Sequence, residues 1–481
     1  MSDPQRQPLK GTLILAVAAA CLSALSGCSM APEYVRPEPR LPTVLGGTAV
    51  APSEGQTERA SLAPDEARFL TSLGGEGVLP GLVAQALVHN SDFNSAVDNV
   101  RLARAALAEH RAALAPQVMG TVQAEKYGFS NSAVDAAGSS NYGFGGLAVH
   151  QDLDIFGRAQ GLSAAARERL GGQEHMQEAA RAALIVQVVR TYVASIAAKE
   201  GARAAATIVE DSRASADAVK LSAKLGAASM SEVTQADLQF EEALTNQRSA
   251  EAATKSVERA LGLLVGYQVR PESVGTEAMA NLARRMTLPE NVPSSVLLRT
   301  PEVMAAESEL RARNADIGAA RAAFFPSISL TGAYGRISDG LGNLFSDAAT
   351  GWAFLPQIDI PIFDFGQRKA NLDAAWVRKQ AGVREYEAAV ERAFKTASDA
   401  IEGLTVAQAR SDVALQRVSE TEKRLTSAQE RASRGLEDAS TVRRLRAASA
   451  HEQMARIQAD SDLIQARADL YSVFHGTDVL K

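Results

Sequence analysis

The chain has 481 residues, a formal net charge of −6 and an aromatic content of 5%. This length permits one large core or several domains, and few aromatic residues with abundant alanine suit long helices packed closely side by side. The modest charge does not indicate nucleic acid as a partner. Both cysteines, Cys21 and Cys28, lie within the first thirty residues. The remainder of the chain therefore offers no disulfide and no thiolate metal site.

The first residues have the layout of a secretory signal. Arg6 and Lys10 precede an apolar stretch at residues 13–25, and small residues follow it. The stretch is shorter than the roughly 20 apolar residues that cross a bilayer. We therefore expect residues 1–27 to be a signal peptide that is removed.

A short motif at the end of this signal resembles the bacterial lipobox. It consists of Leu25, Ser26, Gly27 and Cys28. The resemblance implies cleavage before Cys28 and a diacylglycerol on its thiol, and no other cofactor is expected. The alternative is an ordinary signal cleaved nearby, with Cys28 incidental. Ser29 follows the cysteine in place of an aspartate, which in lipoproteins of this kind implies delivery to the outer membrane.

Residues 28–80 are rich in proline. Seven of the chain's 17 prolines lie between positions 31 and 80. Proline removes a hydrogen-bond donor and fixes φ, so long regular elements are not expected there. We predict a lipidated spacer that runs along the surface as an extended tether.

The rest of the chain repeats itself at an offset of 209 or 210 residues. Prolines, arginines and glycines keep this register; the pairs are Pro116 and Pro326, Arg101 and Arg311, Arg111 and Arg321, Gly157 and Gly366, Gly226 and Gly435, and Gly266 and Gly476. We expect two tandem copies at residues 81–266 and 291–476. A linker at 267–290 joins them, and a short tail at 477–481 follows.

Each copy begins with a helical segment and continues with two strands. In the second copy the helical pattern of residues 301–325 ends at Pro326, because proline disfavours the α conformation of the residue before it. Apolar and small polar residues then alternate along residues 327–334 and again along 352–360, as in a strand with one apolar face. Pro356 interrupts the second strand, so we expect a bulge or an unpaired position there. The first copy shows the same pattern more faintly.

Strands of about ten residues with one apolar face are typical of a membrane β-barrel wall. The alternative is a soluble hairpin whose apolar side faces a core. Two hairpins make four strands, which cannot close a barrel, and backbone groups in a membrane must all be paired. A closed wall therefore needs several chains, and three copies would supply 12 strands.

Long helices are expected after each hairpin. No proline lies between Pro116 and Pro271 or after Pro361, so this breaker is absent. From Gly366 to Gly435 a continuous helix would extend ~100 Å. Apolar and alanine residues recur there at steps of three and four, which predicts paired helices with Gly226 and Gly435 at their turns.

Together these features resemble the TolC-like outer-membrane efflux factors, in particular their lipoprotein branch. The similarity spans nearly the whole chain and rests on the lipobox, the doubled order of elements and three local motifs, at residues 32–37, 155–158 and 362–368. It implies a mainly α protein with membrane β structure, in which a homotrimer forms a 12-stranded β-barrel in outer-membrane lipid and continues into a periplasmic α-helical barrel.

The resemblance also implies a function. Such a protein is the outer-membrane channel of a tripartite efflux pump, and it conducts drugs or small metabolites from a periplasmic adaptor and an inner-membrane transporter. The helical turns of the family contact the adaptor; here they correspond to Leu225, Gly226, Gly435 and Leu436.

Many members of this family carry an aspartate just past the second turn, where this chain has Arg443 and Arg444. We expect Ser440 to cap the final helix, which places both arginines near its N-terminus, where positive charge opposes the helix dipole. They are expected to pair with acids such as Glu232, which forms a capping box with Ser229. Three copies around a narrow axis would also form a gate that repels cations.

Two other classes of protein fit less well. An enzyme is not expected, because the six histidines are scattered without the spacing of a zinc helix and no nucleophile motif is present. Gly143 to Gly146 resemble a phosphate loop only weakly, since no helical pattern follows. A lipoprotein coiled coil that spans the envelope without a pore explains the helices and the lipid, but it leaves the four strands unexplained.

Overall fold

The computed structural model describes residues 31–37, 60–74, 78–126, 141–266, 292–339, 344 and 348–475. The chain divides into two compact units, Met1–Val50 and Ala51–Lys481. In the first unit the described residues 31–37 are exposed and belong to no helix or strand. Cys28 and the expected signal peptide lie outside the described residues. The second unit holds all the elements discussed below.

Two copies of one structural motif make up most of the second unit. The first copy comprises α4 (Ser91–Ala112), β1 (Gln117–Lys126), β2 (Asn141–Leu153), α5 (Arg158–Lys224) and α6 (Met230–Val265). The second comprises η3 (Ser294–Arg299), α8 (Pro301–Ala322), β3 (Ser327–Ser338), β4 (Ala349–Asp359), α9 (Gln367–Ser433) and α10 (Ala439–Phe474). Corresponding helices have equal lengths of 22, 67 and 36 residues. This confirms the expected tandem repeat of helix, β-hairpin and long helical hairpin.

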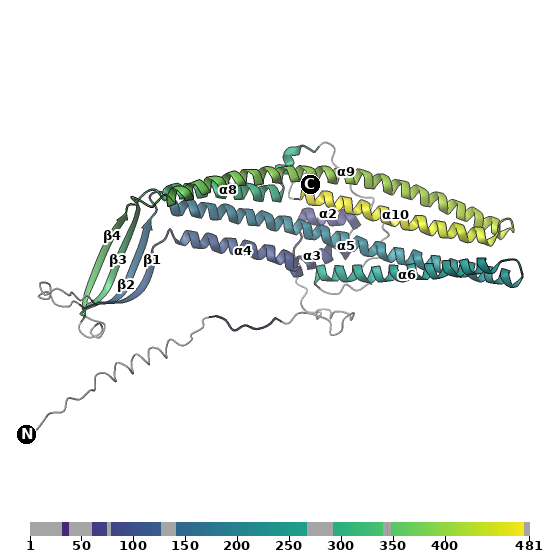
Figure 1. Ribbon diagram of the computed structural model, residues 1–481, viewed down its shortest axis with the longest axis horizontal. Coiled ribbons are helices and arrows are strands. Elements are labelled where there is room, and N and C mark those ends of the chain that lie inside the picture. The colour runs from purple at the N-terminus through teal and green to yellow at the C-terminus, as the bar shows by residue number, and fades with distance from the viewer. Residues whose placement is uncertain are drawn as a thin grey trace, which may run out of the picture. The chain divides into compact units, whose positions relative to one another are not determined.

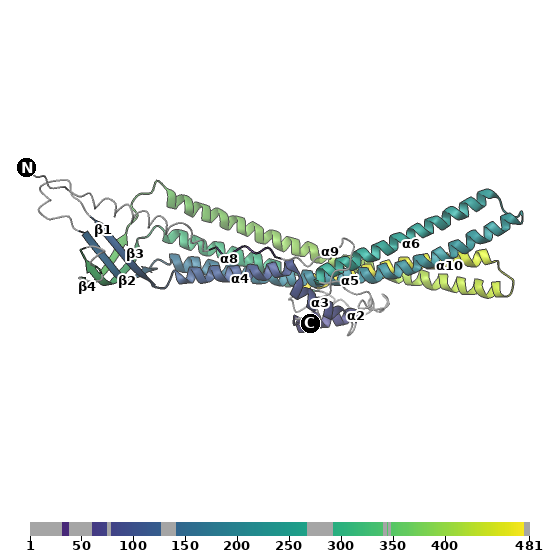
Figure 2. The ribbon, with the colours of Figure 1, turned by 90° about the horizontal axis from the view of Figure 1, so that it is seen from below.

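The helices lie lengthwise beside one another, with the sheet at one end (Figures 1 and 2). Helices α5 and α9 run through the whole bundle. On the sheet side, α4 packs on α5, and α8 packs on both α5 and α9. On the other side, α6 packs on α5, and α10 lies between α5 and α9. The turns of the two hairpins lie at the end opposite the sheet.

Alanine is what allows these helices to approach closely. From Ala375 to Val418 the buried residues of α9 recur at steps of three, four, seven or eight; they are Ala375, Gly382, Ala389, Ala397, Ala400, Leu404, Ala407, Ser411, Ala414 and Val418. This spacing keeps one narrow stripe facing the neighbouring helices, as in a coiled coil. At 67 residues, α9 is ~100 Å long, so many small contacts replace a single wide core.

The largest buried side chains gather in the middle of the bundle, which we call the waist. Ile185, Val188, Val189 and Tyr192 of α5 are at most 2% exposed there. One 18-residue window of α5 is apolar enough to cross a membrane by composition, but more than half of it is buried within the protein. We therefore regard this window as part of the waist core.

The end of the expected spacer is helical and contributes to this core, which corrects the prediction of an extended tether. Helix α2 (Pro64–Gly74) precedes α3 (Val78–His89). The ring of Phe69 stacks on Tyr471 of α10 at 3.8 Å, and Leu70 and Leu73 are almost fully buried. Burying one leucine contributes about 1.5–3 kcal/mol. Pro64 is compatible with the helix because it occupies the first turn, where no hydrogen bond is lost.

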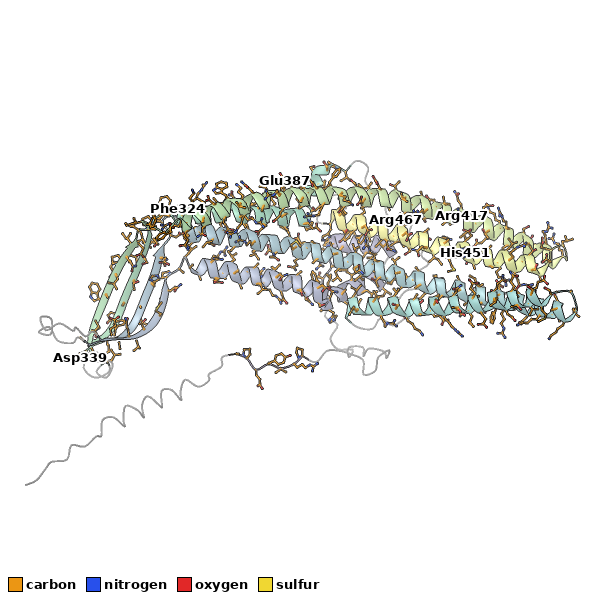
Figure 3. The ribbon with its side chains drawn as sticks, in the orientation of Figure 1. Phe324, Asp339, Glu387, Arg417, His451 and Arg467 are labelled. Carbon is orange, nitrogen blue, oxygen red and sulfur yellow. The ribbon has the colours of Figure 1, made fainter. Side chains whose placement is uncertain are left out.

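The four strands form one antiparallel sheet in the order β1-β2-β3-β4. The central pair, β2 and β3, joins the two copies. Gly146 and Gly335 lie opposite each other in this pair, and a Cβ on either would collide with the backbone of the other strand. Figure 3 shows Phe324 at the helix side of the sheet and Asp339 at its far end.

Pro356 corrects one detail of the sequence prediction. It lies directly opposite Leu330 in a continuous register, with no bulge between β3 and β4. Within the described residues β4 pairs only with β3. Within one chain this proline leaves the register intact, because only the side of β4 that faces β3 has to donate hydrogen bonds there.

Candidate functional site

The register of the sheet gathers most of the large apolar side chains of the four strands on one face. Residues opposite each other share a face, and the pairs on this face include Ile328 with Ile358 and Tyr334 with Trp352. Their neighbours on the same face are Val118, Val122, Leu147, Val149, Leu330 and Phe354. Trp352 is 76% exposed and Tyr334 is 64% exposed. A bare apolar face of this extent suits contact with lipid.

The opposite face of the sheet carries mostly small and polar side chains, although Met119, Phe144, Ile337 and Leu355 also lie on it. Thr331 lies opposite His150, and its Oγ1 is 3.1 Å from Nδ1 of the histidine. Nε2 of His150 is 3.4 Å from Asp152. A face of this polarity can line water, so the two faces of the sheet separate apolar from aqueous surroundings.

Aspartates cap the long helices where they leave the sheet, a role that was not predicted from the sequence. Both α5 and α9 start after a glycine with positive φ, which offers no capping side chain. Asp154 instead accepts hydrogen bonds from the amides of Ala159 and Gln160. Asp364 accepts from the amides of Gly366 and Arg368, which hold its pKa below the ordinary value. An aspartate two or three residues before the glycine that precedes each helix is the sequence pattern from which these caps could have been predicted.

The two helical turns have the same backbone geometry. After α5 the amide of Gly226 donates to Ala223 and that of Ala227 donates to Ser222; after α9 the amide of Gly435 donates to Ala432 and that of Leu436 donates to Arg431. This is the Schellman arrangement, which needs a left-handed residue. Gly226 and Gly435 supply it with φ of 75° and 74°. Leu225 and Leu436 are 77% and 66% exposed beside them.

The start of α10 differs from the prediction in its cap. Asp438, and not Ser440, is the N-cap: its carboxylate accepts from the amide of Thr441 at 2.8 Å and from the Ser440 hydroxyl at 2.5 Å. A carboxylate accepts several hydrogen bonds at once, so it outcompetes the hydroxyl that follows it. These bonds lower the pKa of Asp438 from 3.8 to about 2.

Arg443 and Arg444 lie in the first turns of α10, as expected, but their predicted pairing is wrong. Glu232 forms the expected capping box of α6 with Ser229, and this confirms that part of the prediction. Among the described residues neither arginine has a carboxylate partner: Arg444 reaches the hydroxyl of Thr441 at 3.5 Å, and Nε of Arg443 is buried without a hydrogen bond.

Arg446, about one turn further along α10, does form an ion pair with an acidic side chain. Its Nη1 is 3.2 Å from Oδ1 of Asp211 on α5, and the carboxyl of Asp211 is largely buried. The sequence could not indicate this pair, because its partners lie 235 positions apart on different repeats.

Groups able to perform chemistry do not converge in the described part of the chain. No cluster of three or more histidine, cysteine or acidic side chains there could hold a metal ion. Gly143 to Gly146, which resemble a phosphate loop, lie within strand β2. A sheet with one bare apolar face, continued by long paired helices, defines a membrane channel subunit.

Comparison with known proteins identifies the family. The model of the outer membrane efflux protein family matches residues 82–267 and 292–474, so the chain belongs to this family. It is therefore a non-enzymatic outer-membrane channel component of an efflux pump, and it extends into the periplasm.

The similarity to these relatives extends over most of this chain and over most of each relative. The cation efflux system protein CusC of Escherichia coli O6:H1 is 32% identical over 79% of this chain and 80% of its own. The solvent efflux pump outer membrane protein SrpC of Pseudomonas putida is 30% identical over 95% and 96%. The open state of the MtrE outer membrane channel of Neisseria gonorrhoeae superposes with a TM-score of 0.74 at 27% identity, over 94% of this chain and 99% of its own.

Proposed function

We propose that three copies of this chain close a 12-stranded barrel in the outer membrane and that each copy is anchored by a lipid on Cys28. The channel then conducts small solutes outward from a periplasmic adaptor and an inner-membrane transporter. The observation that carries the proposal is the four-stranded sheet. Its outer strands β1 and β4 each pair with one neighbour within the described residues, and an open edge is not tolerated in lipid. TolC-like channels are trimers, and three sheets of four strands supply the wall. The two repeats, residues 81–266 and 291–476, contribute equally to it.

Purified full-length protein tests the assembly. We expect it to migrate as a trimer on gels without heating, to dissociate on boiling, and to conduct in planar bilayers. A spacer lipoprotein without a pore would give no conductance and no heat-dependent change in migration. That pair of results would contradict the proposal.

The exposed turns are the surface that the adaptor contacts in this proposal. Leu225 and Leu436 present apolar side chains beside rigid left-handed glycines, and such preorganised apolar contacts bind with little ordering cost. Leu225→Asp with Leu436→Asp should abolish capture of the adaptor by cross-linking in the native envelope. Leu225→Met with Leu436→Met should retain it. Equal capture by the two double variants would exclude these turns as the contact.

Arg443 and Arg444 are the proposed gate at the periplasmic end. Support comes from their place beside the turn and from the lack of a carboxylate partner for either side chain among the described residues. Three copies of each would hold positive charge at a narrow axis, which repels cations. Arg443→Ala with Arg444→Ala should raise single-channel conductance and shift ion preference toward cations. Unchanged conductance and selectivity would exclude them from the constriction.

A further inference from the structure

Four helices lie side by side next to the sheet, in the order α4, α5, α8 and α9, so that α4 and α9 are the outermost (Figure 1). The strands follow the matching order β1, β2, β3 and β4. In the proposed barrel β4 of one copy pairs with β1 of the next, which brings α9 of the first copy beside α4 of the second. A single chain already contains a joint of this kind, because α5 and α8 meet between its two repeats.

The internal joint between α5 and α8 is tight and contains an arginine with two acidic partners. A Cβ built on Gly161 of α5 would lie 3.3 Å from the Cβ of Ala319 on α8. Arg169 of α5 forms ion pairs with Glu309 and Asp316 of α8. Close approach of the backbones and this pairing together hold the two repeats against each other.

The corresponding surfaces of α4 and α9 are bare in one chain. Residues of α4 correspond to those of α8 at an offset of 210, and residues of α5 to those of α9 at 209. Ala312 of α8 is fully buried, whereas its counterpart Leu102 on α4 is 68% exposed. Ala319 is 6% exposed, whereas its counterpart Glu109 is exposed. A contact from one repeat to the next that closes on itself forms a ring, and a second copy is the partner that would cover these surfaces.

A groove of about 510 Å³ lies between α4 and α5 at this bare surface. Asn99, Ala103 and Ala106 contribute the α4 side of its lining. In the second repeat the counterpart of Ala103 is Arg313, whose side chain packs against Gly382 of α9. The short side chain of Ala103 leaves the corresponding place in the first repeat open.

The residue suited to this groove is Arg378 of α9. It is the counterpart of Arg169 and is exposed in a single chain. Across a joint built like that of α5 and α8, its guanidinium would reach the counterparts of the two acids on α8. These counterparts are Asn99 and Ala106, which both line the groove and are not acidic.

We therefore propose that the groove between α4 and α5 is a docking site for a second copy of this chain and that it receives Arg378 of that copy. We call this contact, in which α9 also covers Leu102, the seam. The inference rests on the proposed channel function, and it names the residues that hold neighbouring copies together. The seam lacks the two acids of the internal joint, so it is the weaker of the two kinds of joint in the ring.

A disulfide between copies tests the seam. Glu109 and Ala370 are the counterparts of Ala319 and Gly161, whose Cβ positions are 3.3 Å apart, and a disulfide needs about 3.5–4.5 Å. Full-length Glu109→Cys with Ala370→Cys should give covalent dimers and trimers on gels run after boiling without reductant, and monomers with reductant. Glu109→Cys with Trp376→Cys is the matched control, because Trp376 contacts α8 of its own chain; it should run as a monomer in both conditions.

Supplying an acid at the seam gives an independent test. Ala106→Asp restores the counterpart of Asp316, so the trimer should dissociate at a temperature a few degrees above that of the wild type. Ala106→Asp combined with Arg378→Glu sets two acids against each other and should dissociate below the wild type. Ala108→Asp, on the other side of α4, should leave the dissociation temperature unchanged.

The two tests separate the seam from the channel proposal. A wild-type protein that is not a trimer on unheated gels overturns the channel proposal itself. A trimer that forms no more covalent product with Glu109→Cys and Ala370→Cys than the control does overturns the seam. If that variant does not assemble, the temperatures decide: a trimer that Ala106→Asp stabilises no more than Ala108→Asp does overturns the seam as well.

Discussion

At the residue scale, left-handed glycines end the first helix of each hairpin and an aspartate begins the last helix. Gly226 and Gly435 were predicted to end the long helices, because few residues other than glycine adopt a left-handed conformation at low cost, and both have positive φ. The cap of α10 was assigned to Ser440 and belongs to Asp438. Both residues are good N-caps, so sequence alone could not choose between neighbours two positions apart.

The cap at Asp438 makes the second turn sensitive to acid. Its pKa falls from 3.8 to about 2 because hydroxyl and amide donors stabilise the carboxylate. Because the pKa of Asp438 is lower in the folded protein, its ionised carboxylate stabilises the cap fully when the pH is above the ordinary pKa of 3.8. This stabilisation is lost as the pH falls through about 2. Amide hydrogen exchange of α10 should therefore quicken in its first turn between pH 4 and pH 2. Asp438→Ala should show fast exchange already at pH 7, and pH-independent protection in the wild type would contradict this.

At the scale of elements, the alternation in the second hairpin predicted which residues share a face, and the register bears this out. Leu330 and Ile358 lie on the apolar face. A charge at the bilayer midplane of a barrel costs about 2–4 kcal/mol. Leu330→Arg should therefore impair trimer assembly, whereas Thr331→Arg on the opposite face should be tolerated. Equal yields of heat-resistant trimer for the two variants would mean that the faces are assigned wrongly.

Helix α2 shows what composition could not predict. Prolines around it indicated a tether, yet its helix is stabilised by partners far along the chain. Glu66 is buried and accepts two hydrogen bonds from Arg181 and one from the amide of Ala63. Local composition cannot predict tertiary contacts of this kind, because the partners lie 115 positions apart in the chain.

The Glu66–Arg181 pair should make the packing of α2 on the waist depend on pH. Burial alone raises the pKa of Glu66, but the donors of Arg181 and Ala63 outweigh it and bring the pKa below 4.5. The pair thus stabilises the fold fully above pH 4.5 and loses this effect as the pH falls through the lowered pKa. Glu66→Gln should cost about 1.5–3 kcal/mol at pH 7, as loss of hydrogen bonds to a charged group does. Thermal unfolding in detergent measures this, and a variant as stable as the wild type at pH 7 would contradict it.

At the scale of the whole molecule, the repeat register predicted the architecture. Prolines and glycines that end helices occupy corresponding positions in the two copies, even where the other side chains of the copies differ. Equal helix lengths in the two copies follow from that register. The contacts between copies were beyond prediction. The pair of Arg446 with Asp211 and that of Arg190 with Asp469 each join residues more than 230 positions apart, and no local pattern specifies such partners.

The last prediction concerns how the whole chain reaches its membrane. Cys28 lies at the junction of the expected signal and the spacer, and several acyl chains anchor a protein firmly where a single chain does not. Cys28→Ala should leave the sheet and helices able to fold, because the core that holds the helices together is built from residues between Phe69 and Phe474. It should abolish acyl labelling and leave an unprocessed precursor outside the outer-membrane fraction. Cys21→Ala is the matched control, since it lies within the apolar stretch and should change neither labelling nor sorting. Normal sorting of Cys28→Ala with its acyl label retained would show that Cys28 is incidental.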